Sequence, residues 1–555
     1  MPSTNEKPLI DQHGVDEVDV VVVGAGFAGL RALHTLREAG LSVAVLEDGP
    51  DIGGVWYWNR YPGARCDVES YDYSYSFSPR LEQEWRWSER YATQPEILRY
   101  INHVADRFGL RPDIHLDQRM SRAVYDEDTA RWTIETDSGR RWSCQFLVMA
   151  TGQLSVSKSV ELPGQDEFGG RILHTAHWPH ETVDFTGQRV GVIGTGSSGM
   201  QLIPVVAQQA AHLTVFQRTP NFSIPAANAL ISDEEDARLK AHYRERREAA
   251  RNSPSGLGFV PNKQSVLEAD PAERRAQFEA AWNRLGFGFA LAYHDILLDQ
   301  TANDTAADFI REKIAQKVDD PETREKLMPR GFPFGAKRPS VDSGYFETFN
   351  RDNVELVDIR ANPIEQVTQT GVHTSSSHHE LDVLIFATGF DALTGPLLRP
   401  EIVGRGGETL RQKWSAGPVT YLGIGSAGFP NLFIIAGPGS PSLLSNVLVS
   451  TEQHVDWIAE LLTHLRRHEM DEVEATPDAE RRWVEHVNTR ALETLYPKAP
   501  SYYMGANVPG KPHVFMPYSG GVRGYRRILE QVATDGYHGF VMRSSHPATQ
   551  VAGGA

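Results

Sequence analysis

The first strongly patterned stretch of the chain joins an apolar strand, a glycine-rich turn and a helix. Residues 18–23 have the sequence VDVVVV and run directly into the turn GAGFAG at residues 24–29. Leucines at helical spacing follow, and a second apolar strand at residues 42–46 ends at Glu47. This order of strand, tight turn, helix and strand is typical of a unit that binds a dinucleotide.

The same order of elements returns further along the chain. A strand at residues 189–193 meets a second turn, GTGSSG at residues 194–199, and the next strand is expected at residues 213–216. Residues 146–152 and 384–389 resemble each other, because each is an apolar run that ends in Thr-Gly. Continuous apolar runs of this length are typical of buried parallel strands. The chain is therefore predicted to carry two nucleotide-binding units.

These patterns predict an α/β fold with two Rossmann-like dinucleotide-binding domains and a helical insertion. The insertion is expected where the sequence becomes charge-rich and helix-start signals recur, at Ser232 and at Asp270. A strand at residues 431–436 and a helix near residues 447–462 are assigned back to the first domain. The predicted division is 1–150 and 389–555 for the first domain, 151–230 and 331–388 for the second, and 231–330 for the insertion.

Composition narrows the class of protein. The 555 residues are 40% hydrophobic and 23% charged, which is ordinary for a folded globular protein. A net charge of −17 argues against nucleic acid as a partner. The first twenty residues lack the apolar core of a signal peptide, and no apolar run is long enough to span a bilayer. We expect a cytoplasmic protein without membrane insertion.

The two units differ in the side chains at the end of their second strand, and this difference indicates two cofactors. Glu47 is placed to accept hydrogen bonds from a ribose diol, whereas the second unit has Gln217, Arg218 and Thr219 at the corresponding point. A cation there suits a 2′-phosphate, although Arg218 taken alone could be an ordinary exposed arginine. We predict FAD at the first turn and NADPH at the second, and hence flavin redox chemistry.

The cysteines limit which electron acceptor can oxidise the reduced flavin. The chain has two, Cys66 and Cys144, which form no CxxC or CxxxxC pair. A disulfide reductase needs such a pair beside the flavin. We therefore expect the reduced flavin to pass its electrons to O2, and we expect no metal.

Three blocks of the sequence resemble the Baeyer-Villiger monooxygenases. Residues 168–179, here called the fingerprint segment, match the FxGxxxHxxxWP pattern of that family through Phe168, Gly170, His174, Trp178 and Pro179. Residues 53–67 and 335–339 match two further family blocks, and residues 437–442 and 505–511 extend the resemblance over nearly the whole chain. The resemblance is strongest to the aryl-ketone and steroid-ketone subgroup. It implies an FAD- and NADPH-dependent enzyme that converts a hydrophobic ketone into an ester or lactone with O2.

The resemblance also implies roles for individual residues. In this family oxygen adds to the flavin at C4a, and the resulting peroxyflavin must remain an anion until it attacks the carbonyl. Arg338 matches the arginine that stabilises this anion, and Asp67 matches the carboxylate that orients the arginine. Lys337 matches a contact to the 2′-phosphate and would act with Arg218. Without the family match, Asp67 could be a turn residue, and Lys337 with Arg338 a solvated basic pair.

Further residues are assigned through the same resemblance. His174 and Trp178 are interpreted as shaping a linker between the domains rather than reacting. Many family members carry Trp where this chain has Tyr502, so the resemblance does not extend to the detailed fit of cofactor and substrate at this position. Leu443, Leu444 and Met516 are candidate substrate walls, with plain core packing as the alternative. The remaining expected cofactor contacts are Gly24, Gly26, Phe27, Gly29, Gly54, Val55, Trp56, Tyr73, Met120, Gly194, Thr195, Gly196, Ser197, Ser198, Gly199, Gln201 and Thr219.

Two other functions stay open at this point. A flavin monooxygenase that oxygenates nitrogen or sulfur is the nearer alternative, but Arg338 and the Trp178-Pro179 ending argue against it. A protein that binds FAD and NADPH without oxygenating a substrate is the more distant one. The sequence leaves the oligomeric state between a monomer and a weak homo-oligomer.

Overall fold

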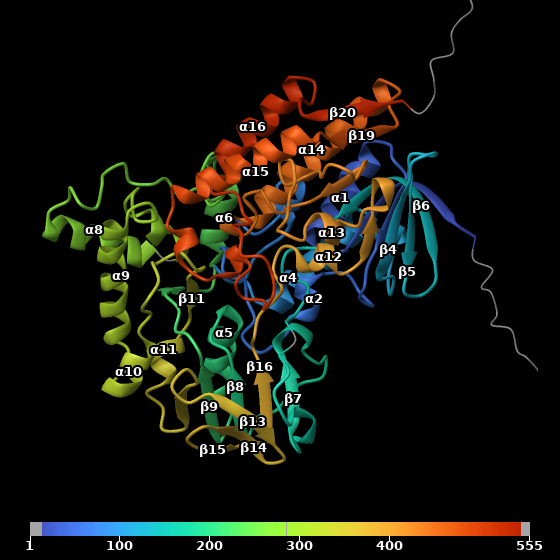
Figure 1. The fold of residues 1–555 in the computed structure, drawn as a ribbon. Helices are drawn as coiled ribbons and strands as arrows, with labels where there is room; N and C mark the ends of the chain where they lie inside the picture. The colour runs from blue at the N-terminus through green and yellow to red at the C-terminus, as the bar shows by residue number, and fades with distance from the viewer. Residues whose placement is uncertain (1–13, 159, 285, 545–555) are drawn as a thin grey trace, which may run out of the picture.

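The computed structural model describes residues 14–158, 160–284 and 286–544. Residues 1–13, most of the stretch in which no signal peptide is expected, lie outside the described part. Figure 1 shows two sheets, with β4, β5 and β6 in the upper half and β7, β8, β9 and β16 in the lower half. Within the described ranges, no helix is long and apolar enough to cross a membrane.

The first sheet is built from both ends of the chain. Its order is β17-β4-β5-β6-β1-β2-β3, and β18 also pairs with β6. β1 lies parallel between β2 and β6, and β18 pairs with the last three residues of β6. The strands are β1 (Asp16–Val23), β2 (Val43–Leu46), β3 (Ile114–His115), β4 (Met120–Asp126), β5 (Arg131–Thr136), β6 (Arg141–Met149), β17 (Glu401–Val403) and β18 (Leu432–Ile434).

Helices cover this sheet and explain its apolar strands. α1 (Phe27–Glu38) follows β1 and packs against α14 (Val447–Arg467). Val20, Val21 and Val22 are fully buried, because both faces of the sheet are covered. The other helices of this half are α2 (Val55–Trp58), α3 (Pro79–Glu84), α4 (Gln94–Arg107), α12 (Gly395–Leu398), α13 (Leu410–Lys413), α15 (Pro477–Leu492) and α16 (Val522–Thr534).

The second sheet is entirely parallel, with the order β12-β9-β8-β16-β7. α5 (Ser197–Val206) follows β8, as the second glycine turn predicts. The fingerprint segment supplies β7, which pairs with β16 at the edge of this sheet. The strands are β7 (Arg171–His174), β8 (Arg189–Ile193), β9 (His212–Gln217), β12 (Val354–Asp358) and β16 (Val383–Phe386), and a small antiparallel sheet adds β13 (Ile364–Thr368), β14 (Gly371–Thr374) and β15 (His378–Glu380).

The predicted helical insertion contacts both halves of the molecule. Tyr243 packs in the core of the first sheet, whereas Phe278 and Phe309 pack in the core of the second. Helices α8, α9 and α10 stand beside the second sheet in Figure 1. The helices are α6 (Asp233–Ala241), α7 (Tyr243–Arg251), α8 (Pro271–Arg284), α9 (Gln300–Ala315) and α10 (Pro321–Leu327). The domain boundaries given above stay a prediction.

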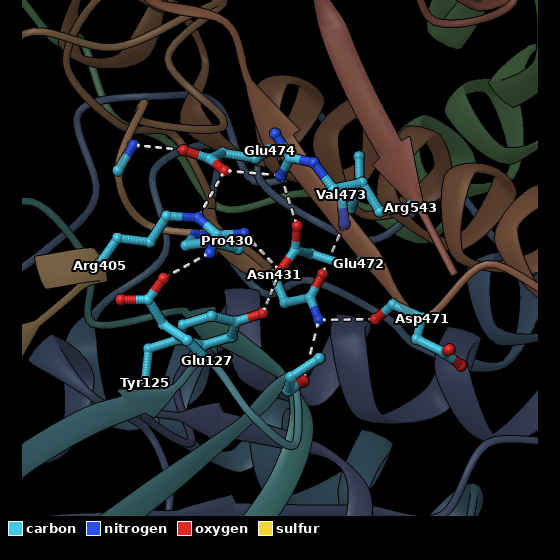
Figure 2. Close-up of polar contacts among 12 residues, drawn as sticks. Tyr125, Glu127, Arg405, Pro430, Asn431, Asp471, Glu472, Val473, Glu474 and Arg543 are labelled. Atoms are coloured by element: carbon cyan, nitrogen blue, oxygen red, sulfur yellow. Dashed lines mark hydrogen bonds and ion pairs between the residues drawn. The ribbon is translucent and has the colours of Figure 1, made fainter. Parts of the chain in front are cut away.

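An ion-pair network attaches the C-terminal region to the first sheet (Figure 2). Arg405, after β17, contacts Glu127 and two glutamates of β19 (Glu472–Ala475), Glu472 and Glu474. Arg543 of β20 (Phe540–Arg543) contacts the same two glutamates. Because one guanidinium binds carboxylates from two separate segments, the network fixes β19 and β20 to the hairpin of β4 and β5.

Candidate active site

The first glycine of each turn has the same geometry. Gly24 has φ 105° and Gly194 has φ 111°, a conformation that residues with a side chain rarely adopt. A Cβ on Gly24 would lie 2.8 Å from the carbonyl oxygen of Ala150, and one on Gly194 would lie 2.4 Å from that of Ala387. Both turns therefore require glycine, because each packs directly against the end of its neighbouring strand.

The other glycines of the two turns differ in how much space a side chain would have. A Cβ on Gly29 or Gly199 would lie 1.8 or 2.2 Å from the carbonyl oxygen of the first glycine of its own turn, so helix and strand touch there. A Cβ on Gly196 would meet nothing within 4 Å. A Cβ on Gly26 would lie in ordinary contact with the backbone of Gly54 at 3.5 Å and of Gly53 at 4.0 Å. The middle glycines thus leave the free N–H groups of α1 and α5 accessible to a ligand.

A single cavity of about 940 Å³ extends from one glycine turn to the other. Most of the residues expected to contact cofactor or substrate line it. They are Gly24, Gly26, Phe27, Glu47, Gly54, Val55, Trp56, Asp67, Tyr73, Met120, Gly194, Thr195, Gly196, Ser197, Ser198, Gln201, Arg218, Thr219, Lys337, Arg338, Leu443 and Tyr502. Those that do not line it are Gly29, Gly199, Leu444, Met516, Phe168, Gly170, His174 and Trp178.

Arg338 is a cation in the wall of the cavity that three hydrogen bonds hold in place. Its Nε and Nη2 donate to the two carboxylate oxygens of Asp67 at 2.8 and 3.0 Å, and its Nη1 donates to the carbonyl of Leu443 at 2.9 Å. The ring of Phe287 covers the guanidinium at 4.3 Å. Burial alone would lower the pKa of Arg338, but the Asp67 carboxylate raises it above its ordinary value. The side chain is therefore a permanent cation in a defined plane.

The acid at the end of β2 also lies where the sequence predicts. Glu47 accepts the N–H of Ala25, within the first turn, at 2.6 Å and the N–H of Gly49 at 2.9 Å. Burial raises the pKa of Glu47, and these two backbone bonds oppose the shift. On the same side of the cavity, Trp56 Nε1 donates to the hydroxyl of Tyr73 at 3.1 Å. Glu47, Trp56 and Tyr73 all line the cavity next to the first turn.

Basic side chains gather beside the second turn. Burial lowers the pKa of Lys337, and Arg218 and Arg360 lower it further through charge repulsion. Burial also lowers the pKa of Lys158, again together with repulsion from Arg218. Several cations held close together in this way are suited to a bound dianion such as a phosphate. Lys158 was not among the predicted residues, although it lies shortly after the Thr-Gly at the end of β6, where α/β proteins bind ligands.

The fingerprint segment joins the two halves of the molecule. His174 stacks on Phe386 of β16 with 5.0 Å between the rings, and Trp178 is buried in the core of the second sheet. His177 contacts Trp58 of α2, ring to ring at 5.8 Å. Gly170 is confined, since a Cβ there would lie 2.3 Å from the carbonyl oxygen of Asp382. The segment is thus a strand of the second sheet that continues into a contact with the first half.

Gln201 makes a second connection between the halves. Its Oε1 accepts the hydroxyl hydrogen of Tyr61 at 2.9 Å, and its Nε2 donates to the carbonyl of Arg65 at 3.0 Å. A Cβ on Gly63 would lie 2.4 Å from the carbonyl oxygen of Gln201. Residues 61–65 therefore lie tightly on α5 and bring Asp67 toward Arg338.

An apolar wall lies next to Arg338. Leu443 lines the cavity and belongs to a cluster with Tyr503 and Met516. Leu444 and Tyr502 pack against the same cluster, but Met516 is only 2% exposed and lies behind the wall. Phe287, which covers Arg338, carried no signal in the sequence.

The residues present fit FAD and NADPH. The two glycine turns both line the cavity and can receive two pyrophosphates there. Glu47 stands beside the first turn and the cations beside the second, which matches a ribose diol and a 2′-phosphate respectively. The free thiols Cys66 and Cys144 are both buried and unpaired.

Comparison with known proteins assigns the family. A family model described as pyridine nucleotide-disulphide oxidoreductase matches residues 21–255. A Baeyer-Villiger monooxygenase of Pseudooceanicola batsensis is 44% identical over 94% of this chain and 95% of its own length. The chain belongs to the Baeyer-Villiger monooxygenases.

Two further proteins are similar to nearly the whole of this chain. The phenazine N-monooxygenase PhzNO1 of Lysobacter antibioticus is 42% identical over 96% of this chain and 98% of its own length. A solved structure of an oxidized steroid monooxygenase bound to NADP is 53% identical, with a TM-score of 0.92, and covers 95% of this chain and 100% of that one. The predicted fold with two dinucleotide-binding domains is confirmed. As a Baeyer-Villiger monooxygenase, the protein is a flavoenzyme that uses FAD, NADPH and O2.

Proposed function

We propose that the enzyme inserts one oxygen atom beside the carbonyl of a hydrophobic ketone, aryl, cyclic or steroid-like, and so forms an ester or lactone. The observation that carries the proposal is the Arg338–Asp67 pair in the wall of a cavity that both glycine turns reach. An apolar wall containing Leu443 beside this pair supports a hydrophobic substrate. The similar structure of a steroid monooxygenase is consistent with a bulky ketone.

In this proposal the chain's own residues position the reactants and hold charge. Bound FAD, reduced with two electrons from NADPH, supplies the chemistry that places one oxygen atom of O2 in the product and the other in water. Arg338 holds the negative charge that develops on oxygen while the carbonyl is attacked, since a guanidinium is always cationic and donates no proton. Asp67 is a positioning residue that fixes the plane of Arg338.

Arg338 has N–H groups left over for this role. A guanidinium has five N–H bonds, and three are used in the contacts to Asp67 and Leu443 within the described ranges. Arg218 and Lys337 bind the 2′-phosphate of NADPH, and Glu47 binds the ribose of FAD. His174 and Trp178 of the fingerprint segment shape the connection between the two halves and do not react. A cytoplasmic location and a monomeric or weakly oligomeric state remain predictions.

The test replaces Arg338 by alanine and follows the two half-reactions separately. In Arg338→Ala the reduction of FAD by NADPH should stay close to that of wild type, whereas ester formation should fall at least 100-fold, as for loss of an anion-stabilising donor. Aryl, cyclic and steroid ketones serve as the panel, and a mass gain of one oxygen atom is the readout. A normal yield of ester in this variant would remove Arg338 from the mechanism.

The similarity to a phenazine N-monooxygenase gives a second candidate function, oxygenation of nitrogen. A tertiary amine or an aromatic N-heterocycle in the same assay distinguishes the two functions through the N-oxide product. If N-oxide forms and no ketone in the panel gains oxygen, the ketone assignment is wrong. If neither product forms and one H2O2 appears for each NADPH oxidised, the enzyme does not oxygenate these classes of compound.

A further inference from the structure

Arg246 of α7 closes a tight turn that begins two residues after Asp67. In this turn the N–H of Asp72 donates to the carbonyl of Glu69 at 2.9 Å. The Nε and Nη2 of Arg246 donate to the two carboxylate oxygens of Asp72 at 2.7 and 2.6 Å, and Nη2 also donates to Glu69 at 2.8 Å. Asp72 is only 4% exposed, so its charge depends on this partner. One guanidinium from the predicted insertion thus holds the turn in a defined shape.

The turn lies between two residues of the active-site cavity. Asp67, which binds Arg338, precedes it, and Tyr73, which follows it directly, lines the cavity. Neither Arg246 nor the two carboxylates that it binds line the cavity. Any effect of Arg246 on the reaction must therefore pass through the backbone that carries Asp67 and Tyr73.

The same turn is attached to the loop that supplies the third hydrogen bond of Arg338. The carbonyl of Asp72 accepts a hydrogen bond from Nδ2 of the buried Asn446 at 2.7 Å. Asn446 is the N-cap of α14, and it follows Leu443 by three residues. The carbonyl of Leu443 accepts Nη1 of Arg338. Asp72 thus connects the two segments that hold the Arg338 guanidinium.

The next residue of α7 extends this attachment. Arg247 is 7% exposed and donates to the hydroxyl of Ser74 at 2.8 Å and to the carbonyl of Tyr75 at 3.2 Å. It also donates to Glu82 at 2.8 Å. Two consecutive arginines of the predicted insertion therefore hold residues 69–75.

We propose that Arg246 is a positioning residue for the oxygen-transfer step, and that it acts through Asp72 on both segments that orient Arg338. The inference rests on the proposed role of Arg338. Without Arg246 the Asp72 carboxylate is buried without its cation, and the turn must shift to bring that charge to water. A shift of the Asp67 carboxylate or the Leu443 carbonyl turns the guanidinium, and errors of about 1 Å in such positions are costly to the rate.

The test compares Arg246→Met with wild type in the FAD-loaded enzyme. Ester formation should fall about 3- to 10-fold, less than in Arg338→Ala because the Arg338 guanidinium is still present. Anaerobic reduction of FAD by NADPH should change less than about 2-fold, and NADPH oxidised without ester should appear as H2O2. Hydrogen exchange measured by mass spectrometry without a ketone should become at least about 5-fold faster in residues 69–76.

Arg405 provides a matched control. It also binds carboxylates of more than one residue, its side chain is 27% exposed against 26% for Arg246, and it does not line the cavity. Arg405→Met should lower Tm, because it breaks the network of Figure 2, but it should keep the wild-type ratio of ester to H2O2. It should also keep the wild-type exchange of residues 69–76.

Asp72→Asn tests whether the effect passes through Asp72. The double variant Arg246→Met, Asp72→Asn should lose no more ester formation than the more affected single variant, because both changes remove the same contact. If Arg246→Met does not retain FAD, Arg246→Lys, which keeps the charge but not the planar fork, should show the same changes at smaller size.

Each outcome decides the inference. A wild-type ester yield in Arg246→Met overturns it, and so does unchanged exchange in residues 69–76. Equal uncoupling in Arg405→Met, or additive losses in the double variant, would also overturn it. If wild type forms no ester from any ketone, the proposed function is wrong, and the exchange result still decides whether Arg246 holds the turn.

Discussion

The carboxylate of Asp67 can be removed with little change in shape by the substitution Asp67→Asn. Asp67 accepts two N–H bonds from Arg338, and both side chains are about one-fifth exposed, 23% and 21%. The amide loses the negative charge and turns an NH2 group toward a donor. A hydrogen bond to a charged group contributes about 1.5–3 kcal/mol, and the partial exposure places the loss toward the lower value. Ester formation should therefore fall about 10- to 30-fold.

The effect should be confined to the oxygen-transfer half of the reaction. Reduction of FAD by NADPH, followed by anaerobic stopped-flow absorbance, should change less than about 3-fold, while H2O2 released for each NADPH rises. Arg338 keeps its bond to Leu443, so Asp67→Asn should lose less activity than Arg338→Ala.

A neighbouring ion pair offers the control for this substitution. Arg65 and Glu89 lie 3.0 Å apart with 22% and 24% exposure, so Glu89→Gln makes the same chemical change in the same kind of environment. Glu89→Gln should leave ester yield close to wild type. If Asp67→Asn forms ester at the wild-type rate, or loses flavin reduction in equal measure, the orienting role of Asp67 is wrong.

Two further variants test other parts of the structure. The double variant Arg218→Ala, Lys337→Ala should raise KM for NADPH at least 10-fold and KM for NADH much less, because only NADPH carries the 2′-phosphate. Steady-state kinetics with each cofactor measures the two KM values. An equal rise in both would contradict the 2′-phosphate site. Burial lowers the pKa of His454 from 6.5 to about 3. Between these two pH values the His454 ring is neutral in the folded protein but protonated in the unfolded chain. Stability should fall by about 1.4 kcal/mol for each pH unit below 6.5, down to about pH 3. The Tm of His454→Gln should fall less steeply between pH 7 and pH 5, and parallel curves for variant and wild type would exclude His454 as the cause.

The local patterns of the chain were sufficient to predict the two nucleotide-binding units. Residues 18–29 and 189–199 each form a strand and a glycine turn where expected, because those glycines are required by contacts within the same unit. The bond between Arg338 and Asp67 joins positions 271 residues apart, and only the family resemblance placed them together. Periodicity carries no information about a contact of that separation.

Other features depended on tertiary structure and had no local signal. Phe287 covers Arg338 from a short 3-10 helix in the predicted insertion, where the sequence pattern indicates only helix. The fingerprint segment was interpreted as a linker, and the structure shows that part of it is also a sheet strand, β7. A four-residue edge strand is too short to be recognised from alternation alone.

The division of the first sheet between the two ends of the chain affects when the flavin site can exist during synthesis. β18 pairs with β6, and 283 positions separate Met149 from Leu432. At typical rates of translation, about 5–20 residues per second, the ribosome needs roughly 15–60 s to make the intervening chain. Until then the last three residues of β6 lack their pairing with β18. FAD can therefore be captured in its final site only after nearly four-fifths of the protein has been made.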